Sequence, residues 1–168
     1  MYATSMADIR IRKRKRMREK EIKAVSEELS ALFGTQTFME DDPLDIAEGP
    51  DFNLMFCGND ILGMVYDGKP FLTVRGLHKF KPEKRFITVD MGAVKFVTNG
   101  ADVMGPGIIE ADEDIKEGDL VWIRDERNRM PLAVGMALRD TEGIRAKEKG
   151  KAVMMLHYVG DKLWKAGE

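Results

Sequence analysis

The first half of the chain shows a helical period and then strand-like alternation. Between residues 15 and 33, apolar side chains recur every three or four positions, the period of an amphipathic helix, and Gly34 follows as a typical helix stop. The apolar stripe consists of Ile22, Val25, Leu29, Leu32 and Phe33. Strand-like segments follow at residues 52–57, 61–66 and 69–74. The pattern predicts a helix packed on a small antiparallel sheet.

Turn residues divide these segments. Asp67 and Gly68 separate two strand-like segments, and such a pair closes a tight β-hairpin. Asn59 and Asp60 are predicted to close an earlier hairpin. Residues 77–85 are charged and contain a proline, so they are interpreted as a linker between two domains, residues 1–82 and residues 83–168. Residues 1–7 are expected to form a tail.

The second half predicts short strands at residues 120–123, 131–138 and 152–159, separated by turn residues. In the middle one, Ala133, Gly135 and Ala137 share a face of small side chains, so a neighbouring element can approach it closely. Strands of this length and spacing favour a small barrel or sandwich. Together the two halves predict an α+β protein.

A helix and a glycine bend stand between these halves. Ala93, Phe96 and Val97 have the spacing of one buried stripe, and Gly100 is suited to end the helix in the left-handed conformation. Asp90 is predicted to cap the helix N-terminus, and Asp102 to stand in a turn. In the bend at residues 105–107, two glycines without Cβ atoms leave the backbone open to another molecule.

The residues of this region resemble the signature of a known family. Asp90-x-Gly92-Ala93, followed by Gly-Ala-Asp-Val-Met-Gly-Pro-Gly-Ile at residues 100–108, is similar to the PUA domain, an RNA-binding module named after pseudouridine synthase and archaeosine transglycosylase. Residues 77–79 and 161–164 are similar to the malignant-T-cell-amplified-sequence proteins, their archaeal relatives and the ligatin-type translation factors. The resemblance implies a PUA-type β pseudo-barrel with short helices after the N-terminal domain.

In PUA domains the RNA surface is made by the first helix, the turn after it and the last strand region. Carried onto this sequence, the resemblance predicts RNA-binding residues at Lys95, Gly100, Ala101, Asp102, Val103, Met104, Gly105, Pro106, Gly107, Lys149 and Lys151.

Charge is distributed unevenly around a net value of −2. A basic run extends through residues 10–20, and such runs contact RNA phosphates in some proteins and form a solvated face in others. An acidic stretch follows, made of Glu40, Asp41, Asp42, Asp45, Glu48 and Asp51. No apolar run approaches the ~20 residues of a membrane span, and Cys57 is the only cysteine. We therefore expect a cytoplasmic protein without membrane contact.

Candidates for catalysis or metal binding are few. His78, His157 and Cys57 do not have zinc-ligand spacing, and His157 is better explained as a packed strand residue with a hydrogen bond. Nucleophile-elbow, phosphate-loop and dinucleotide motifs are missing. We expect neither enzymatic activity nor a cofactor.

The resemblance implies an RNA-binding protein that acts in translation initiation or recycling, on the small ribosomal subunit or the tRNA end, with rRNA or tRNA as ligand. Its N-terminal domain is expected to meet a protein similar to density-regulated protein or to an initiation factor. Two alternatives remain open at this point. One is an accessory that delivers RNA to a pseudouridine synthase or transglycosylase; the other is a protein-interaction module with a vestigial RNA surface.

Overall fold

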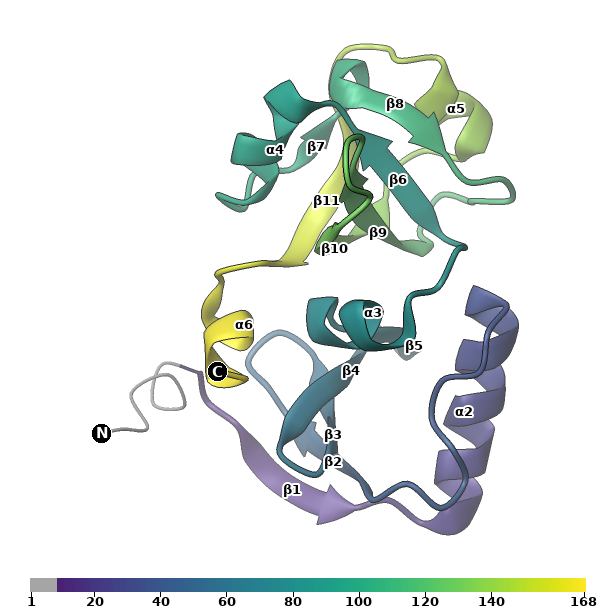
Figure 1. The fold of residues 1–168 in the computed structure, drawn as a ribbon, viewed down its shortest axis with the longest axis vertical. Helices are drawn as coiled ribbons and strands as arrows, with labels where there is room; N and C mark the ends of the chain where they lie inside the picture. Colours follow the sequence, from purple (N-terminus) through teal and green to yellow (C-terminus); the bar gives the residue numbers. More distant parts are fainter. Residues whose placement is uncertain (1–8) are drawn as a thin grey trace. The chain divides into compact units, whose positions relative to one another are not determined.

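The computed structural model describes residues 9–168 and divides into two compact units (Figure 1). The first unit comprises residues 9–82 together with Lys162–Glu168, and the second is Glu83–Asp161. The tail predicted for residues 1–7 lies outside the described residues. No described helix combines the length and the apolar character that crossing a membrane would need.

The first unit is built on an antiparallel sheet. Its strands, in the spatial order β1-β2-β3-β4-β5, are β1 (Arg12–Arg16), β2 (Leu44–Glu48), β3 (Asn53–Cys57), β4 (Asp60–Tyr66) and β5 (Lys69–Leu72). Helix α2 (Glu19–Phe33) ends at Gly34 with φ 68°, as predicted. It packs on the sheet through Phe33, whose ring centre lies 4.8 Å from that of Phe71 on β5. The predicted helix on a small antiparallel sheet is confirmed.

The turns of this sheet differ in part from the prediction. Asp67 and Gly68 both have positive φ, at 50° and 77°, and close the β4–β5 hairpin as expected. Asp60 instead pairs with Cys57 in the ladder, so residues 58–59 form the preceding turn. The predicted linker at residues 77–85 is also shorter, because helix α3 (Val74–Phe80) continues through fully buried Leu77.

The basic run and part of the acidic stretch form neighbouring strands. On β1, Arg14 and Arg16 place their Nε atoms 2.7 and 2.6 Å from the Asp45 carboxylate on β2. Arg12 pairs with Glu48 at 3.5 Å, and the Arg14 guanidinium also lies 4.0 Å from the centre of the Phe56 ring. The hydrogen bonds from Arg16 and then from Arg14 lower the pKa of the Asp45 carboxyl. Part of the charge in both runs is therefore paired within the sheet.

The second unit is a mixed sheet with the spatial order β7-β11-β10-β9-β6-β8. Its strands are β6 (Phe86–Val89), β7 (Val103–Met104), β8 (Ile108–Ala111), β9 (Leu120–Asp125), β10 (Pro131–Ala137) and β11 (Lys151–Tyr158). Strands β6 and β9 are parallel. Helix α4 (Met91–Val97), the 3₁₀ turn η1 (Gly105–Gly107) and helix α5 (Thr141–Arg145) connect them.

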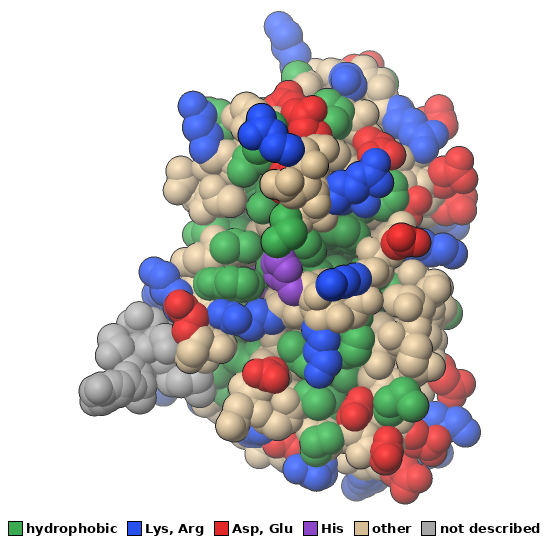
Figure 2. All heavy atoms as spheres, in the orientation of Figure 1, with side chains coloured by type: hydrophobic (Ala, Val, Ile, Leu, Met, Phe, Trp, Pro, Cys, Tyr) green, Lys and Arg blue, Asp and Glu red, His purple; other side chains and the backbone are tan. Residues whose placement is uncertain are grey.

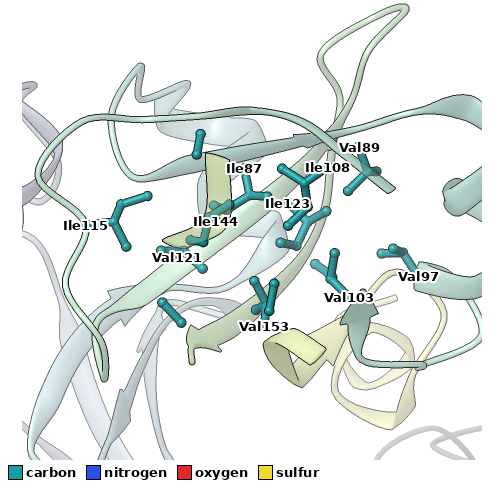
Figure 3. Packing of buried hydrophobic residues seen from close by; sticks show 14 residues of the cluster. Ile87, Val89, Val97, Val103, Ile108, Ile115, Val121, Ile123, Ile144 and Val153 are labelled. Atoms are coloured by element: carbon teal, nitrogen blue, oxygen red, sulfur yellow. The ribbon is translucent and has the colours of Figure 1, made fainter. Parts of the chain in front are cut away.

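Aliphatic side chains from most of these elements fill the centre of the second unit (Figure 3). Ile87, Val121 and Ile123 are fully buried there, and Val97 and Val103 join them from α4 and β7. Gly135 on β10 permits the predicted close approach, since a Cβ at that position would lie 2.5 Å from a Val153 methyl group on β11.

The C-terminal residues belong to the first unit, in contrast to the predicted domain of residues 83–168. Helix α6 (Lys162–Ala166) buries Leu163 and Ala166 against Leu54 and Phe56 of β3. The Arg75 guanidinium of α3 also lies 3.9 Å from the centre of the Trp164 ring, and its Nη2 donates to the Trp164 carbonyl. Apolar burial and the stacked Arg75 hold the C-terminal residues on the first unit.

We predict that Leu163→Ala destabilises the first unit by about 2–4 kcal/mol, because it leaves a cavity beside β3. Hydrogen exchange should show faster opening of amides on β3 and β4. Lys165→Ala, on the exposed side of the same helix, should change stability by less than about 0.5 kcal/mol. Faster exchange confined to β9 and β10 would instead assign α6 to the second unit.

Candidate nucleic-acid interface

A groove of about 570 Å³ lies between helix α4 and the segment that follows it in the second unit. It is lined by Asp90, Gly92, Ala93, Phe96, Val97, Ala101, Asp102, Val103, Met104, Pro106, Gly107 and Lys151. Most of these side chains are apolar, and the polar ones are two carboxylates and one ammonium group. A concave apolar surface with a few polar groups is the usual form of a ligand site.

Backbone and carboxylate contacts hold α4 against the bend. Asp90 caps the helix as predicted, accepting a 2.9 Å hydrogen bond from the Ala93 N–H. The Asp90 N–H donates to the carbonyl of Gly107 at 3.0 Å, which joins the start of α4 to the end of η1. Glu126 accepts from the Met91 N–H at 2.7 Å. Because carboxylates occupy the start of α4, a phosphate is not expected to bind there.

Phe96 lies on the surface, although its spacing predicted burial. Its exposed fraction is 57%, against 1% for Val97, and Ala93 and Val94 are partly buried against the core. Helix α4 has only two turns, so the core covers one side of it and leaves the Phe96 ring in the groove. Lys95 places its Nζ 5.3 Å from the centre of this ring. An exposed aromatic ring beside a lysine offers a stacking surface to a planar ligand.

The glycines of this region have different roles. Gly100 has φ 87°, and a Cβ there would lie 2.8 Å from the Tyr158 ring. A Cβ at Gly105 would overlap the carbonyl oxygen of Glu148. The sequence predicted that the bend stays open to another molecule, but at Gly105 the protein's own backbone occupies the space. Gly107 remains in the groove, where a Cβ would meet only the Ala93 Cβ at 3.2 Å.

Asp102 attaches the wall of the groove to strand β11. Its Oδ1 accepts a 2.8 Å hydrogen bond from the Met155 N–H, and its Oδ2 lies 3.0 Å from the Lys151 Nζ. The Met155 N–H and then Lys151 lower the pKa of the Asp102 carboxyl. Asp102 therefore has a more specific role than the turn residue predicted from the sequence.

The structure brings most of the predicted RNA-binding residues together. Seven line the groove: Ala101, Asp102, Val103, Met104, Pro106, Gly107 and Lys151. Gly100 packs against Tyr158 and Gly105 against Glu148, and Lys95 lies beside Phe96. The exposed Lys149 belongs to a turn whose backbone carbonyls accept hydrogen bonds from Arg139 and from the Gly105 N–H. Sequence reasoning placed Phe96 in the core and did not identify it as a groove residue.

The residues considered for catalysis or metal binding are not grouped into such a site among those that the structure describes. His157 is buried and places its Nδ1 2.8 Å from the Asp161 carboxylate, as expected for a packed strand residue. Among residues 9–168, no group of three or more His, Cys, Asp or Glu side chains is arranged to hold a metal ion. On the face shown in Figure 2, basic and acidic side chains are interspersed.

Known proteins are similar to this chain in sequence and in fold. The PUA domain family matches residues 85–159. An uncharacterised protein of Methanocaldococcus jannaschii is 40% identical over 92% of this chain and 96% of its own length. Translation machinery-associated protein 20 of Saccharomyces cerevisiae is 36% identical, and the match covers 52% of each chain, so this chain spans about half of that relative. A hypothetical protein from Pyrococcus horikoshii has a crystal structure with a TM-score of 0.80 and 31% identity, covering 93% of this chain and 100% of that one.

We predict that Gly105→Ala lowers the free energy of unfolding by about 1–3 kcal/mol, because the added methyl group overlaps the Glu148 carbonyl. Gly107→Ala should cost less than about 1 kcal/mol, since the Ala93 Cβ needs to give by only a few tenths of an ångström. Chemical denaturation of both variants measures the difference. Equal losses would mean that the turn at residues 148–150 moves away readily.

We also predict that Asp102 contributes to the acid stability of the second unit. Its folded pKa lies below the unfolded value of about 3.9, so its contribution is present above that pH and is lost as pH falls through the folded pKa. Asp102→Asn should therefore reduce stability at pH 7 and flatten its decline as the pH falls below about 4. Denaturation at several pH values tests this, and an unchanged slope would contradict it.

Proposed function

The chain belongs to the PUA-domain proteins, with the translation machinery-associated and malignant T-cell-amplified sequence proteins among its relatives, and from this premise we propose that it binds RNA in the translation apparatus. The groove beside α4 holds a short unpaired segment of rRNA or of a tRNA end. The protein acts without catalysis, in initiation or recycling on the small ribosomal subunit in the cytoplasm.

The exposed Phe96 ring is the observation that carries this proposal. Single-stranded nucleic acids bind through stacking of bases on aromatic side chains combined with cationic groups along the backbone. Phe96 offers the ring, and apolar neighbours such as Met104 and Pro106 extend the surface. Lys95 lies beside the ring, and Lys151 lines the groove. Both ammonium groups would contact phosphates of the same RNA segment.

The first unit supplies the proposed protein contact. Because Asp45 and Glu48 pair with β1, the acidic stretch offers a partner its other members, which are Asp51 and the group at residues 40–42. That group lies beside Met39, whose exposed fraction is 52%, in a cleft of about 660 Å³ that also includes Glu19 and the β1-strand residue Arg16. Exposed methionine adapts to different partners, and carboxylates favour basic ones. We propose that a protein similar to density-regulated protein or to an initiation factor docks on this unit.

We predict that Phe96→Ala raises the Kd for a single-stranded RNA by about 5- to 150-fold, the loss of one stacked base. Phe96→Tyr keeps the ring and should bind like the wild type. Because Phe96 is exposed, both variants should unfold like the wild type. Wild-type affinity in a folded Phe96→Ala variant would show that the groove is not the RNA site.

The role in translation is tested by sedimentation of native lysate. Wild-type protein should move with the small ribosomal subunit and leave it after RNase treatment, and Phe96→Ala should be depleted from that fraction. Movement with an RNA-modifying enzyme instead of the ribosome would favour the accessory role. Retention after RNase treatment would favour a protein-mediated contact.

A further inference from the structure

The turn between β9 and β10 carries two arginines, Arg127 and Arg129, that do not line the groove. Residues 126–130 are all exposed. Arg127 and Arg129 make no ion pair among the residues that the structure describes. The carboxylates of the same turn are engaged, since Asp125 accepts from the Asn128 N–H at 2.6 Å and Glu126 accepts from Met91. The two guanidinium groups are therefore available to an anion.

Glu126 attaches this turn to one end of the groove. Its 2.7 Å bond to the Met91 N–H lies at the first residue of α4, between groove residues Asp90 and Gly92. The turn is also ordered internally, because the Arg129 N–H donates to the Asp125 carbonyl at 3.1 Å and Arg129 has φ 55°. The arginines thus project from a turn whose position relative to the groove is set by hydrogen bonds.

Another cation, Lys151, lies toward the other end of α4. Lys151 pairs with Asp102, which follows the C-terminal end of α4. Helix α4 has 7 residues, so these two ends are separated by about 10 Å along the helix. The start of α4 is closed to phosphate by Asp90 and Glu126. A backbone that leaves the groove beyond the start of α4 is therefore not expected to bind the helix terminus, and the turn that carries the arginines is bonded to α4 at this point through Glu126.

We propose that the β9–β10 turn is a second RNA-backbone contact, in which Arg127 and Arg129 hold phosphates of the strand that leaves the groove beyond the start of α4. This inference rests on the proposed function and adds to it a direction for the bound strand, from Lys151 along the groove to the turn. Guanidinium groups suit the role because they donate two hydrogen bonds to one phosphate and stay charged at all physiological pH values.

Salt dependence of RNA binding distinguishes this contact from others. Each phosphate contact on a single strand contributes about −0.7 to the slope of log affinity against log salt. Arg127→Ala with Arg129→Ala should therefore make the slope shallower by about 1.4. It should also raise the Kd by roughly tenfold at physiological salt. The RNA used in this measurement should be single-stranded and several nucleotides longer, at both ends, than the segment that the groove binds.

The matched control removes two exposed lysines of the same unit, Lys84→Ala with Lys116→Ala. Lys84 precedes β6, and Asp90 follows it, so the length of that strand, about 13 Å, separates this lysine from the start of α4. The control has the same loss of charge and should keep nearly the wild-type slope. An equal change in slope for both double variants would mean that only net charge matters, and would overturn the proposal.

Glu126 positions the β9–β10 turn through its hydrogen bond to the Met91 N–H. Glu126→Ala releases the turn and should weaken RNA binding, whereas Glu126→Gln keeps an acceptor oxygen for the Met91 N–H and should restore it. Thermal stability of each variant is measured beside binding. If Phe96→Ala weakens binding but the arginine variant does not, the turn is not a contact and the proposed function stands. If the wild type binds no RNA, the proposed function itself fails.

Discussion

The close approach of residues 100–107 to strand β11 and the turn before it is the constraint on which the groove depends. Gly105 lies against the Glu148 carbonyl, and Gly100 lies under the Tyr158 ring with a left-handed backbone. Asp102 then ties the same segment to the Met155 N–H. Because this segment is held at its two glycines and at one carboxylate, it is fixed as the wall of the groove that faces α4.

Part of the charge in this protein is paired across its own sheets. Asp45 and Glu48 of β2 pair with arginines of β1, and Asp125 and Glu126 accept hydrogen bonds from backbone N–H groups. Exposed ion pairs contribute little stability individually, so this pairing chiefly determines which charges remain for partners. In the second unit the charges that make no ion pair among the described residues include Lys95 beside the apolar groove. In the first unit they include the carboxylates of Glu40 and Asp41 beside the exposed Met39.

Residues that are far apart in the sequence belong to the same unit. The second unit leaves the first after Pro82 and returns to it at Lys162, so both ends of the described chain belong to one unit. Leu163 and Arg75 supply the apolar and stacking contacts of that return. Two covalent connections, in place of one linker, therefore join the units, and α6 links the last strand of the second unit to the core of the first.

Local pattern determined most of the elements of this protein. The helix ending at Gly34, the Asp67–Gly68 turn, the Asp90 cap and the small face of β10 follow from period, turn chemistry and side-chain size, which neighbouring residues suffice to express. Tertiary structure decided the rest. Whether Phe96 is buried depends on which side of α4 the core covers, and whether Gly105 meets a ligand or Glu148 depends on a segment more than forty residues away. The same holds for the pairing of Arg14 and Arg16 with Asp45, because charges distant in sequence meet only when the strands align.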